Sequence, residues 1–122
     1  MWRTMARLDA PARIIRTTLG EYLAGYDDVD ACVYVIACYP ALGVLYVGKT
    51  DFMGVRHRLR QHLNETEYED RVGGFLRSCF ADACGFRLDL LLPPVGDGVG
   101  CWLRDAEHAL IAKFAPVFNV MP

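Results

Sequence analysis

One apolar stretch constrains the fold of this chain more than any other part of it. Residues 32–38 read CVYVIAC, a run rich in β-branched side chains that predicts a buried strand. Residues 39–43 contain a proline and a glycine, and residues 44–47 (VLYV) then resume the strand pattern. Two strand-like runs joined by a short turn predict a β-hairpin. We therefore expect an antiparallel sheet near the middle of the chain.

The remaining segments predict helices that cover this sheet. Residues 9–11 combine a capping aspartate with a proline, and apolar side chains then recur at helical spacing until Gly25. Three further segments show helical periodicity: residues 52–63, about 69–80, and 102–114, the last stopped by Pro116. A third strand is predicted at residues 86–92, before a loop rich in glycine and proline at 93–100. The expected fold class is α+β, with a small, mostly antiparallel three-stranded sheet flanked by helices.

The length of the chain sets the expected domain organisation. Its 122 residues fit one domain, and a hydrophobic fraction of 53% argues against a disordered chain. We expect residues 1–30 to form an N-terminal helical extension and residues 31–122 to form the main domain. No apolar run approaches the roughly 18 residues that a membrane span requires, so no membrane association is expected.

The cysteine pattern bears on the cellular compartment. There are five cysteines, an odd number, and none of them form a C-x-x-C pair. Neither a disulfide framework nor a zinc site is therefore predicted. We expect free thiols in a reducing, cytoplasmic environment.

Net charge alone does not indicate a partner, because it is only −2. The distribution of charge is more informative. Within residues 31–64, one acidic residue, Asp51, accompanies four basic ones, a local charge of +3: Lys49, Arg56, Arg58 and Arg60. The acidic residues gather instead at 27–30 and 65–70. Because each phosphate contact adds salt-dependent affinity, a few such contacts predict weak, salt-sensitive binding to a nucleic acid.

Glu107 stands out on the predicted helix 102–114. It lies within the apolar side of that helix, where an unpaired carboxylate is costly unless a cation, a hydrogen-bonded partner or an exposed edge accommodates it. An ordinary explanation is a glutamate at the rim of the core, paired with an arginine. The functional explanation is a metal ligand, since Mg²⁺ prefers oxygen donors and commonly takes only one or two protein carboxylates.

Five other residues carry side chains that could take part in chemistry. Arg58 and His62 are spaced i, i+4 and share a helix face, either as a solvated basic surface or as a phosphate clamp. Tyr34 and Tyr46 lie in the two strands of the predicted hairpin, where tyrosines are common core residues. Lys49, three residues after Tyr46, is one of only two lysines in the chain.

Taken in order, these residues resemble the GIY-YIG nuclease superfamily. The matching segments are Cys32-Val33-Tyr34, Tyr46-Val47-Gly48, the helix sequence RLRQH at 58–62, Glu107, and Asn119 in the sequence PVFN. The resemblance runs from about residue 31 to residue 119, and it depends on the order and spacing of the motifs rather than on any one of them.

Two departures from the family pattern concern individual positions. Cys32 replaces the glycine of the first tripeptide. The stretch between Tyr46 and Arg58 is slightly long, so Arg56 competes for the arginine position. Arg58 is preferred because His62 then falls into the expected helical register.

The resemblance implies a metal-dependent DNA endonuclease that hydrolyses phosphodiester bonds to leave a 5′-phosphate and a 3′-hydroxyl. Glu107 would hold a single Mg²⁺ or Mn²⁺, and Arg58 would bind the scissile phosphate. Tyr34 would act as general base, with Tyr46 and His62 assisting. The implied substrate-binding set is Lys49, Arg56, Arg60 and Asn119, of which Asn119 would also brace the site.

A tyrosine base raises an energetic question, because forming a phenolate at pH 7 costs about 4 kcal/mol. Lys49, Arg58 or the metal ion could stabilise the phenolate of Tyr34. Alternatively, Tyr34 could pass its proton to Lys49 or His62 during the attack.

Two other interpretations remain at this point. The chain could be a catalytically inactive GIY-YIG-fold module that binds nucleic acid or acts as a scaffold, or an unrelated α+β domain. The expected partner is DNA, with further DNA contacts from the first helix and the glycine-rich loop, from a partner protein or from a homodimer.

Overall fold

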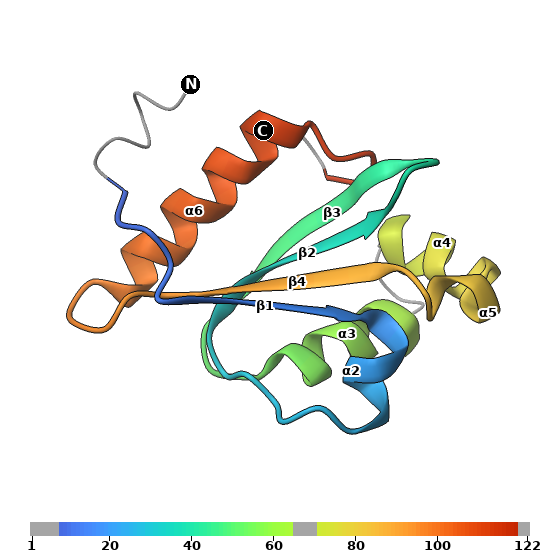
Figure 1. Cartoon of the computed structure of the whole chain (residues 1–122), viewed down its shortest axis with the longest axis horizontal. Helices are drawn as coiled ribbons and strands as arrows, with labels where there is room; N and C mark the ends of the chain where they lie inside the picture. Colours follow the sequence, from blue (N-terminus) through green and yellow to red (C-terminus); the bar gives the residue numbers. More distant parts are fainter. Residues whose placement is uncertain (1–7, 65–70, 120–122) are drawn as a thin grey trace.

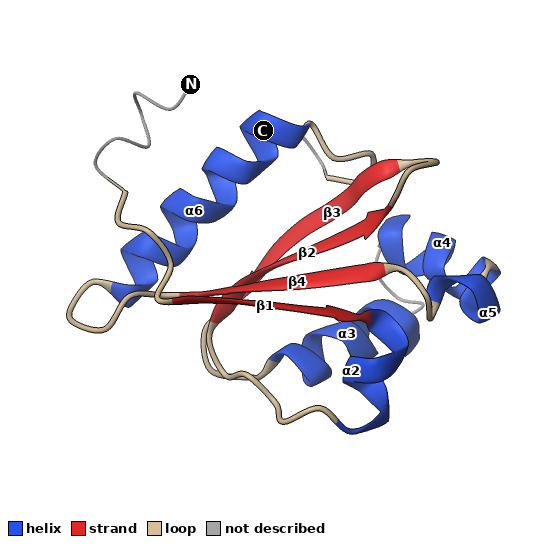
Figure 2. Cartoon of the chain, viewed as in Figure 1, coloured by secondary structure: helices blue, strands red, loops and turns tan. Residues whose placement is uncertain are grey.

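The structure, a computed structural model, describes residues 8–64 and 71–119. It is an α+β fold with one four-stranded sheet in the order β1-β4-β2-β3, in which every neighbouring pair is antiparallel (Figures 1 and 2). The elements in chain order are β1 (Arg13–Thr18), α2 (Leu19–Gly25), β2 (Cys32–Cys38), β3 (Gly43–Thr50), α3 (Val55–Asn64), α4 (Arg71–Ser78), α5 (Phe80–Ala83), β4 (Arg87–Leu92) and α6 (Val99–Phe114).

The predicted hairpin is confirmed. β2 pairs with β3 in a register that sets Tyr34 opposite Gly48 and Val35 opposite Val47, with an irregularity after Ile36. β2 is buried at six of its seven positions because it is an interior strand, covered on both faces.

The prediction of one helix from residue 9 to residue 25 is wrong in its first half. Arg13–Thr18 is a strand that pairs along its whole length with β4, and α2 begins only at Leu19, where the hydroxyl of Thr18 accepts from the backbone N–H of Glu21 at 3.2 Å. The sheet therefore has four strands, not three. β1, which falls within the region expected to be an N-terminal extension, therefore belongs to the same sheet as β2, β3 and β4.

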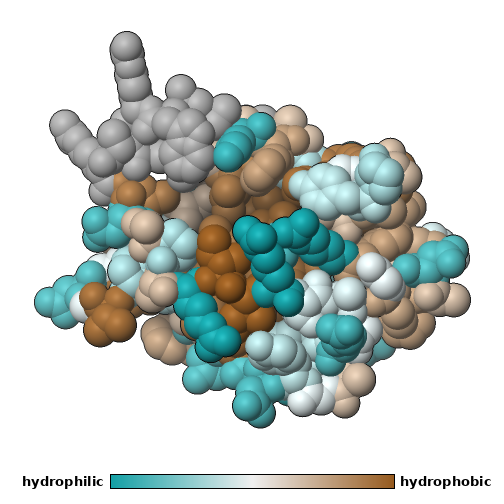
Figure 3. Space-filling view, viewed as in Figure 1, coloured by the Kyte–Doolittle hydropathy of each residue, from teal (hydrophilic) through white to brown (hydrophobic). Residues whose placement is uncertain are grey.

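The two edges of the sheet are protected in different ways. On the face seen in Figure 3, hydrophilic side chains flank an apolar strip near the middle of the molecule, where Figure 1 places the edge strand β1. Arg13 and Arg16 of β1 are exposed, a composition that disfavours pairing with another chain. At the other edge, Val117 and Phe118 donate backbone hydrogen bonds to β3, at 3.3 and 2.9 Å.

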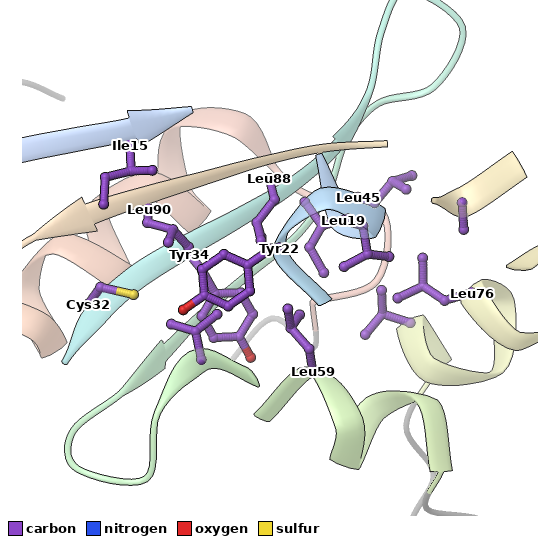
Figure 4. Close-up of a cluster of buried hydrophobic side chains, with 14 residues drawn as sticks. Ile15, Leu19, Tyr22, Cys32, Tyr34, Leu45, Leu59, Leu76, Leu88 and Leu90 are labelled. Carbon is purple, nitrogen blue, oxygen red and sulfur yellow. The ribbon is translucent and has the colours of Figure 1, made fainter. Parts of the chain in front are cut away.

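Helices cover the two faces of the sheet unequally. α6 is the one described helix that packs against the first face, where its apolar side meets Val33, Val35 and Val47. α2, α3 and α4 cover the opposite face, and the larger core cluster lies there (Figure 4). β3, as an edge strand, is therefore approached by α6 from one face and by α3 from the other.

The remaining helices are close to their predicted positions. α6 begins at Val99, three residues before the predicted start, so the preceding loop is shorter than expected. The predicted helix at about 69–80 is divided into α4 and α5; its first two residues lie outside the described residues. Within the described part of the chain, no helix combines the length and apolarity needed to cross a bilayer.

α3 begins at Val55 rather than at residue 52 because a distant residue caps it. The Asp28 carboxylate accepts from the backbone N–H of Arg56 at 3.0 Å, and the backbone N–H of Val55 donates to the carbonyl of Val29 at 3.0 Å. Gly54 has φ +87°, and a side chain there would overlap the Asp28 carboxylate. These contacts fix where the chain leaves β3 and enters α3.

Candidate active site

A cleft of about 600 Å³ lies where the end of β3 meets α3 and α6. Its polar lining comes from three elements that are far apart in the sequence: Tyr46, Lys49 and Asp51 from β3 and the residues after it, Arg58 and Gln61 from α3, and Glu107 from α6. The edge position of β3 makes this possible, because helices on opposite faces of a sheet can meet only around an edge. Four of the predicted site residues therefore share one cavity.

Tyr34 does not line this cleft. Its side chain is fully buried in the larger core cluster (Figure 4), and its hydroxyl lies 2.8 Å from Nε2 of His62, in a hydrogen bond whose direction depends on the histidine tautomer. Burial raises the pKa of the Tyr34 phenol above its usual range, the nearby Tyr46 raises it further, and Arg58 opposes the shift. A phenol so hard to ionise and so far from solvent is poorly suited to the predicted role of general base.

Tyr46 is the tyrosine that faces the cleft. It is half-buried and packs against the same core cluster. Its ring centroid lies 6.1 Å from that of Tyr34 and 5.1 Å from that of His62, so the three rings form one compact group. Tyr34 and His62 therefore lie on the core side of Tyr46, away from the cleft.

Gly48 makes room for this group of rings. A Cβ atom at residue 48 would lie 2.5 Å from both Cζ and the hydroxyl oxygen of Tyr34, and 2.8 Å from Cε2 of Tyr46. Tyr34 is opposite Gly48 in the hairpin register, and Tyr46 lies two residues before it, so all three share one face of the sheet. The close approach requires glycine.

Arg58 and His62 are held differently, although they lie on one helix. Nη1 of Arg58 donates to Oε1 of Gln61 at 2.8 Å, which orients the guanidinium within the cleft. His62 is only 2% exposed, and its carbonyl accepts from Nη1 of Arg77 at 2.6 Å. A side chain on Gly73 of α4 would overlap that carbonyl, so α4 fixes the end of α3 that carries His62.

Glu107 is half-buried on the cleft wall. Burial raises the pKa of its carboxyl and Asp51 adds to the rise, whereas Lys49, His108 and Arg58 lower it. Among the described residues, no hydrogen bond or ion pair within 4 Å engages the Glu107 carboxylate. A half-buried carboxylate in this setting is stabilised by an added cation.

The cleft offers two carboxylates to a Mg²⁺ or Mn²⁺ ion, which suits an ion that keeps several of its waters. No cluster of three or more acidic, histidine or cysteine side chains suited to a metal occurs in the described parts of the chain. Glu107 and Asp51, however, share the cleft. Since Mg²⁺ commonly keeps several waters and takes one or two carboxylates, these two residues could hold it.

The other predicted site residues have different surroundings. The guanidinium of Arg56 donates to the carbonyls of Tyr22, at 3.2 Å, and Tyr26, and it lies over the Tyr22 ring. Arg60 lines a separate groove to which α2, α3, α4 and α5 all contribute. Neither arginine contributes to the lining of the cleft.

Asn119 acts on the backbone of β3. Its Oδ1 accepts from the N–H of Val47 and its Nδ2 donates to the Val47 carbonyl, both at 2.8 Å. The side chain thus pairs with β3 as a further strand would. Asn119 thus holds the backbone next to Tyr46, and it is itself absent from the cleft lining.

The sequence pattern did not single out three residues of the site. Asp51 and Gln61 line the cleft, and Gly48 provides the space for the rings. Gly48 and Gln61 fall within the motifs that carry the resemblance, so a signal for them was present. Comparisons of the chain with models of protein families, with curated proteins and with solved structures found no match.

Proposed function

We propose that this chain is a metal-dependent endonuclease that hydrolyses DNA phosphodiester bonds, leaving a 5′-phosphate and a 3′-hydroxyl. One observation carries the proposal: Tyr46, Lys49, Arg58 and Glu107, which come from three separate elements, line a single cleft. Two cations, a phenol and a carboxylate form a set of groups suited to a phosphodiester, a water and a divalent ion.

Lys49 and Arg58 would bind the scissile phosphate. The guanidinium of Arg58 offers several N–H donors in one plane, and its hydrogen bond to Gln61 restricts its orientation. Lys49, on β3, adds a compact charge near Glu107. Together they would stabilise the additional negative charge of the pentacoordinate transition state.

Tyr46, once ionised to the phenolate, would receive the proton from the attacking water and become a neutral phenol. Tyr46 lines the cleft, whereas the side chains of Tyr34 and His62 are buried in the core. The water oxygen forms a bond to phosphorus as the bond to the 3′ oxygen breaks, and the 3′ oxygen takes up a proton from solvent. The role that the resemblance assigns to Tyr34 thus passes to Tyr46, and Tyr34 positions His62.

Glu107, with Asp51, would hold the divalent ion. A divalent ion bound there would neutralise the negative charge that develops on the leaving oxygen. Ionised Glu107 is the form that binds it, so the carboxylate must lose its proton in spite of its raised pKa.

The test uses the purified chain with supercoiled, linear, branched and single-stranded DNA, in the presence of Mn²⁺ or Mg²⁺ or of a chelator, with RNA as a further substrate. Cleavage is expected only with metal, and Glu107→Gln is expected to abolish it. Asp105→Asn is the matched control, because Asp105 is an exposed carboxylate on the same helix. Binding without cleavage under all these conditions would instead indicate the catalytically inactive module.

A further inference from the structure

Two apolar side chains project into solvent at the mouth of the cleft. Phe52 is 89% exposed and Met53 is 61% exposed, and both line the same cavity as Lys49 and Arg58. Scattered exposed apolar residues are ordinary on protein surfaces. An almost fully exposed phenylalanine beside two cations in a concave site is a stronger indication of a binding site, because it combines an aromatic face with positive charge.

The loop that carries these side chains is anchored at both ends. Thr50, at the end of β3, is buried, and Val55, at the start of α3, is held by the Val29 carbonyl. Beside Val55, the left-handed Gly54 packs against Asp28, whose carboxylate also accepts from the hydroxyl of Tyr22 at 2.6 Å. Only four residues, 51–54, connect these anchor points. Phe52 is thus presented to solvent on a short connection with fixed ends.

An exposed aromatic ring next to two cations matches the chemistry of a nucleotide better than that of an apolar peptide. A nucleotide carries an anionic phosphate and a flat base whose faces stack on aromatic side chains. Lys49 and Arg58 supply the charge complement, and Phe52 supplies the flat apolar face. A base inside a duplex has both faces covered by its neighbours, so it offers no face to Phe52.

We propose that Phe52, flanked by Met53, is a stacking platform for an unpaired base next to the phosphate held by Lys49 and Arg58. The substrate class is then single-stranded DNA or DNA with locally unpaired nucleotides, such as a flap, a loop or a frayed end. This inference rests on the proposed function for the location of the phosphate, and it adds the feature of the substrate that the site selects.

Binding measurements test the platform separately from cleavage. The whole chain carrying Glu107→Gln would be titrated, by fluorescence anisotropy at about 50 mM salt, against a labelled DNA single strand of about 12 nucleotides. A blunt duplex of the same sequence and a strand of equal length made only of abasic nucleotides serve as comparisons. The abasic strand keeps the phosphates and lacks every base.

Phe52→Ala is expected to weaken binding of the ordinary single strand roughly 5- to 150-fold, the range associated with the loss of one stacked base. Binding of the duplex and of the abasic strand is expected to remain unchanged. Phe52→Trp is expected to retain the affinity, and its added fluorescence is expected to be quenched by the ordinary strand alone. Phe80→Ala is the matched control, since Phe80 is a half-exposed aromatic residue in the separate groove and is expected to have no effect.

Each result discriminates between the two proposals. Equal binding of the ordinary strand with and without Phe52, or an equal loss on the abasic strand, overturns the platform. If metal-dependent cleavage persists in that case, the nuclease proposal stands without it. Phe52-dependent binding without any cleavage supports the platform and removes the nuclease, whereas the absence of binding to any strand together with the absence of cleavage refutes both.

Discussion

The Tyr34 ring occupies the space that a side chain at residue 48 would need. A Cβ atom at Gly48 would lie 2.5 Å from the hydroxyl oxygen and from Cζ of Tyr34. Both residues are paired neighbours in the hairpin, so neither strand can move away without breaking the register. The packing of the two motif tyrosines therefore depends on a missing side chain.

Gly48→Ala is accordingly expected to destabilise the fold by about 1–3 kcal/mol, the usual effect of overpacking a core, and to lower DNA cleavage by displacing Tyr46. Urea denaturation and plasmid nicking measure the two effects. Gly100→Ala is the control, because a Cβ there meets open space on α6. Its stability is expected to be unchanged or raised by up to about 1 kcal/mol. Equal stability of both alanine variants would contradict the close packing.

Substitutions of the two tyrosines separate the base from the positioning residue. Tyr34→Phe removes the hydrogen bond to the buried His62 and is expected to cost about 1–3 kcal/mol of stability, with partial loss of cleavage. Tyr46→Phe is expected to cost less stability than Tyr34→Phe, because Tyr46 is only half-buried, and to abolish cleavage. If Tyr34→Phe abolishes cleavage at unchanged stability while Tyr46→Phe remains active, the base is Tyr34.

The pKa of Glu107 predicts a pH-dependent effect on stability. Its carboxyl has a raised pKa in the folded protein, because burial disfavours the charged form. The folded state therefore holds this proton more tightly than the unfolded state, whose carboxyl titrates near its usual value of about 4.3. As pH rises from that value through the folded pKa, Glu107 lowers the free energy of unfolding, and above the folded pKa the full penalty is present.

Without metal at pH 7, Glu107→Gln is therefore expected to raise Tm, and this advantage is expected to vanish below about pH 4. Added Mn²⁺ is expected to raise the Tm of the wild-type chain and not that of the glutamine variant. Thermal denaturation followed by circular dichroism, with and without a chelator, measures both effects. An identical Mn²⁺ response in the two proteins would place the ion elsewhere.

Arg56 and Arg58 are expected to differ although they lie two residues apart on α3. Arg56→Ala removes the hydrogen bonds to the carbonyls of Tyr22 and Tyr26 and is expected to destabilise the fold by about 1–3 kcal/mol. Arg58→Lys keeps the charge, and we expect cleavage to fall by at least about tenfold at nearly unchanged stability. Chemical denaturation and initial rates distinguish the two. A reversed pattern would assign the phosphate to Arg56.

Asn119→Ala tests positioning against substrate binding. Loss of the two hydrogen bonds to Val47 is expected to lower stability by about 1–2 kcal/mol. DNA affinity is expected to remain unchanged, since Asn119 is not among the residues that line the cleft. A large loss of affinity at full stability would make Asn119 a substrate ligand.

The sequence predicted best those elements whose burial is uniform. β2 is an interior strand, so its apolar run was unambiguous, and α6 buries a continuous stripe. β1 was taken for a helix because Ile14 and Ile15 fitted helical spacing together with Leu19 and Tyr22. Its strand conformation depends on pairing with β4, which lies about seventy residues later in the chain, and no local pattern reports such a contact.

The candidate site was predictable in residue identity and less so in role. The motif order brought forward Tyr46, Arg58 and Glu107, which share the cleft. It could not show that Tyr34 is enclosed in the core or that Arg56 serves the backbone of α2, because both facts depend on tertiary packing. Phe52 lay in the segment expected to be helical, so its exposure was not foreseen.

The edge position of β3 has a consequence for how the molecule is made. A chain emerging from the ribosome presents Tyr46, Asp51 and Arg58 well before Glu107, which α6 contributes to the cleft. The cavity is complete only when α6 packs against the sheet and residues 117–119 form their hydrogen bonds to β3. Synthesis thus supplies Glu107 after every other residue of the cleft lining, and a product truncated before α6 lacks this carboxylate.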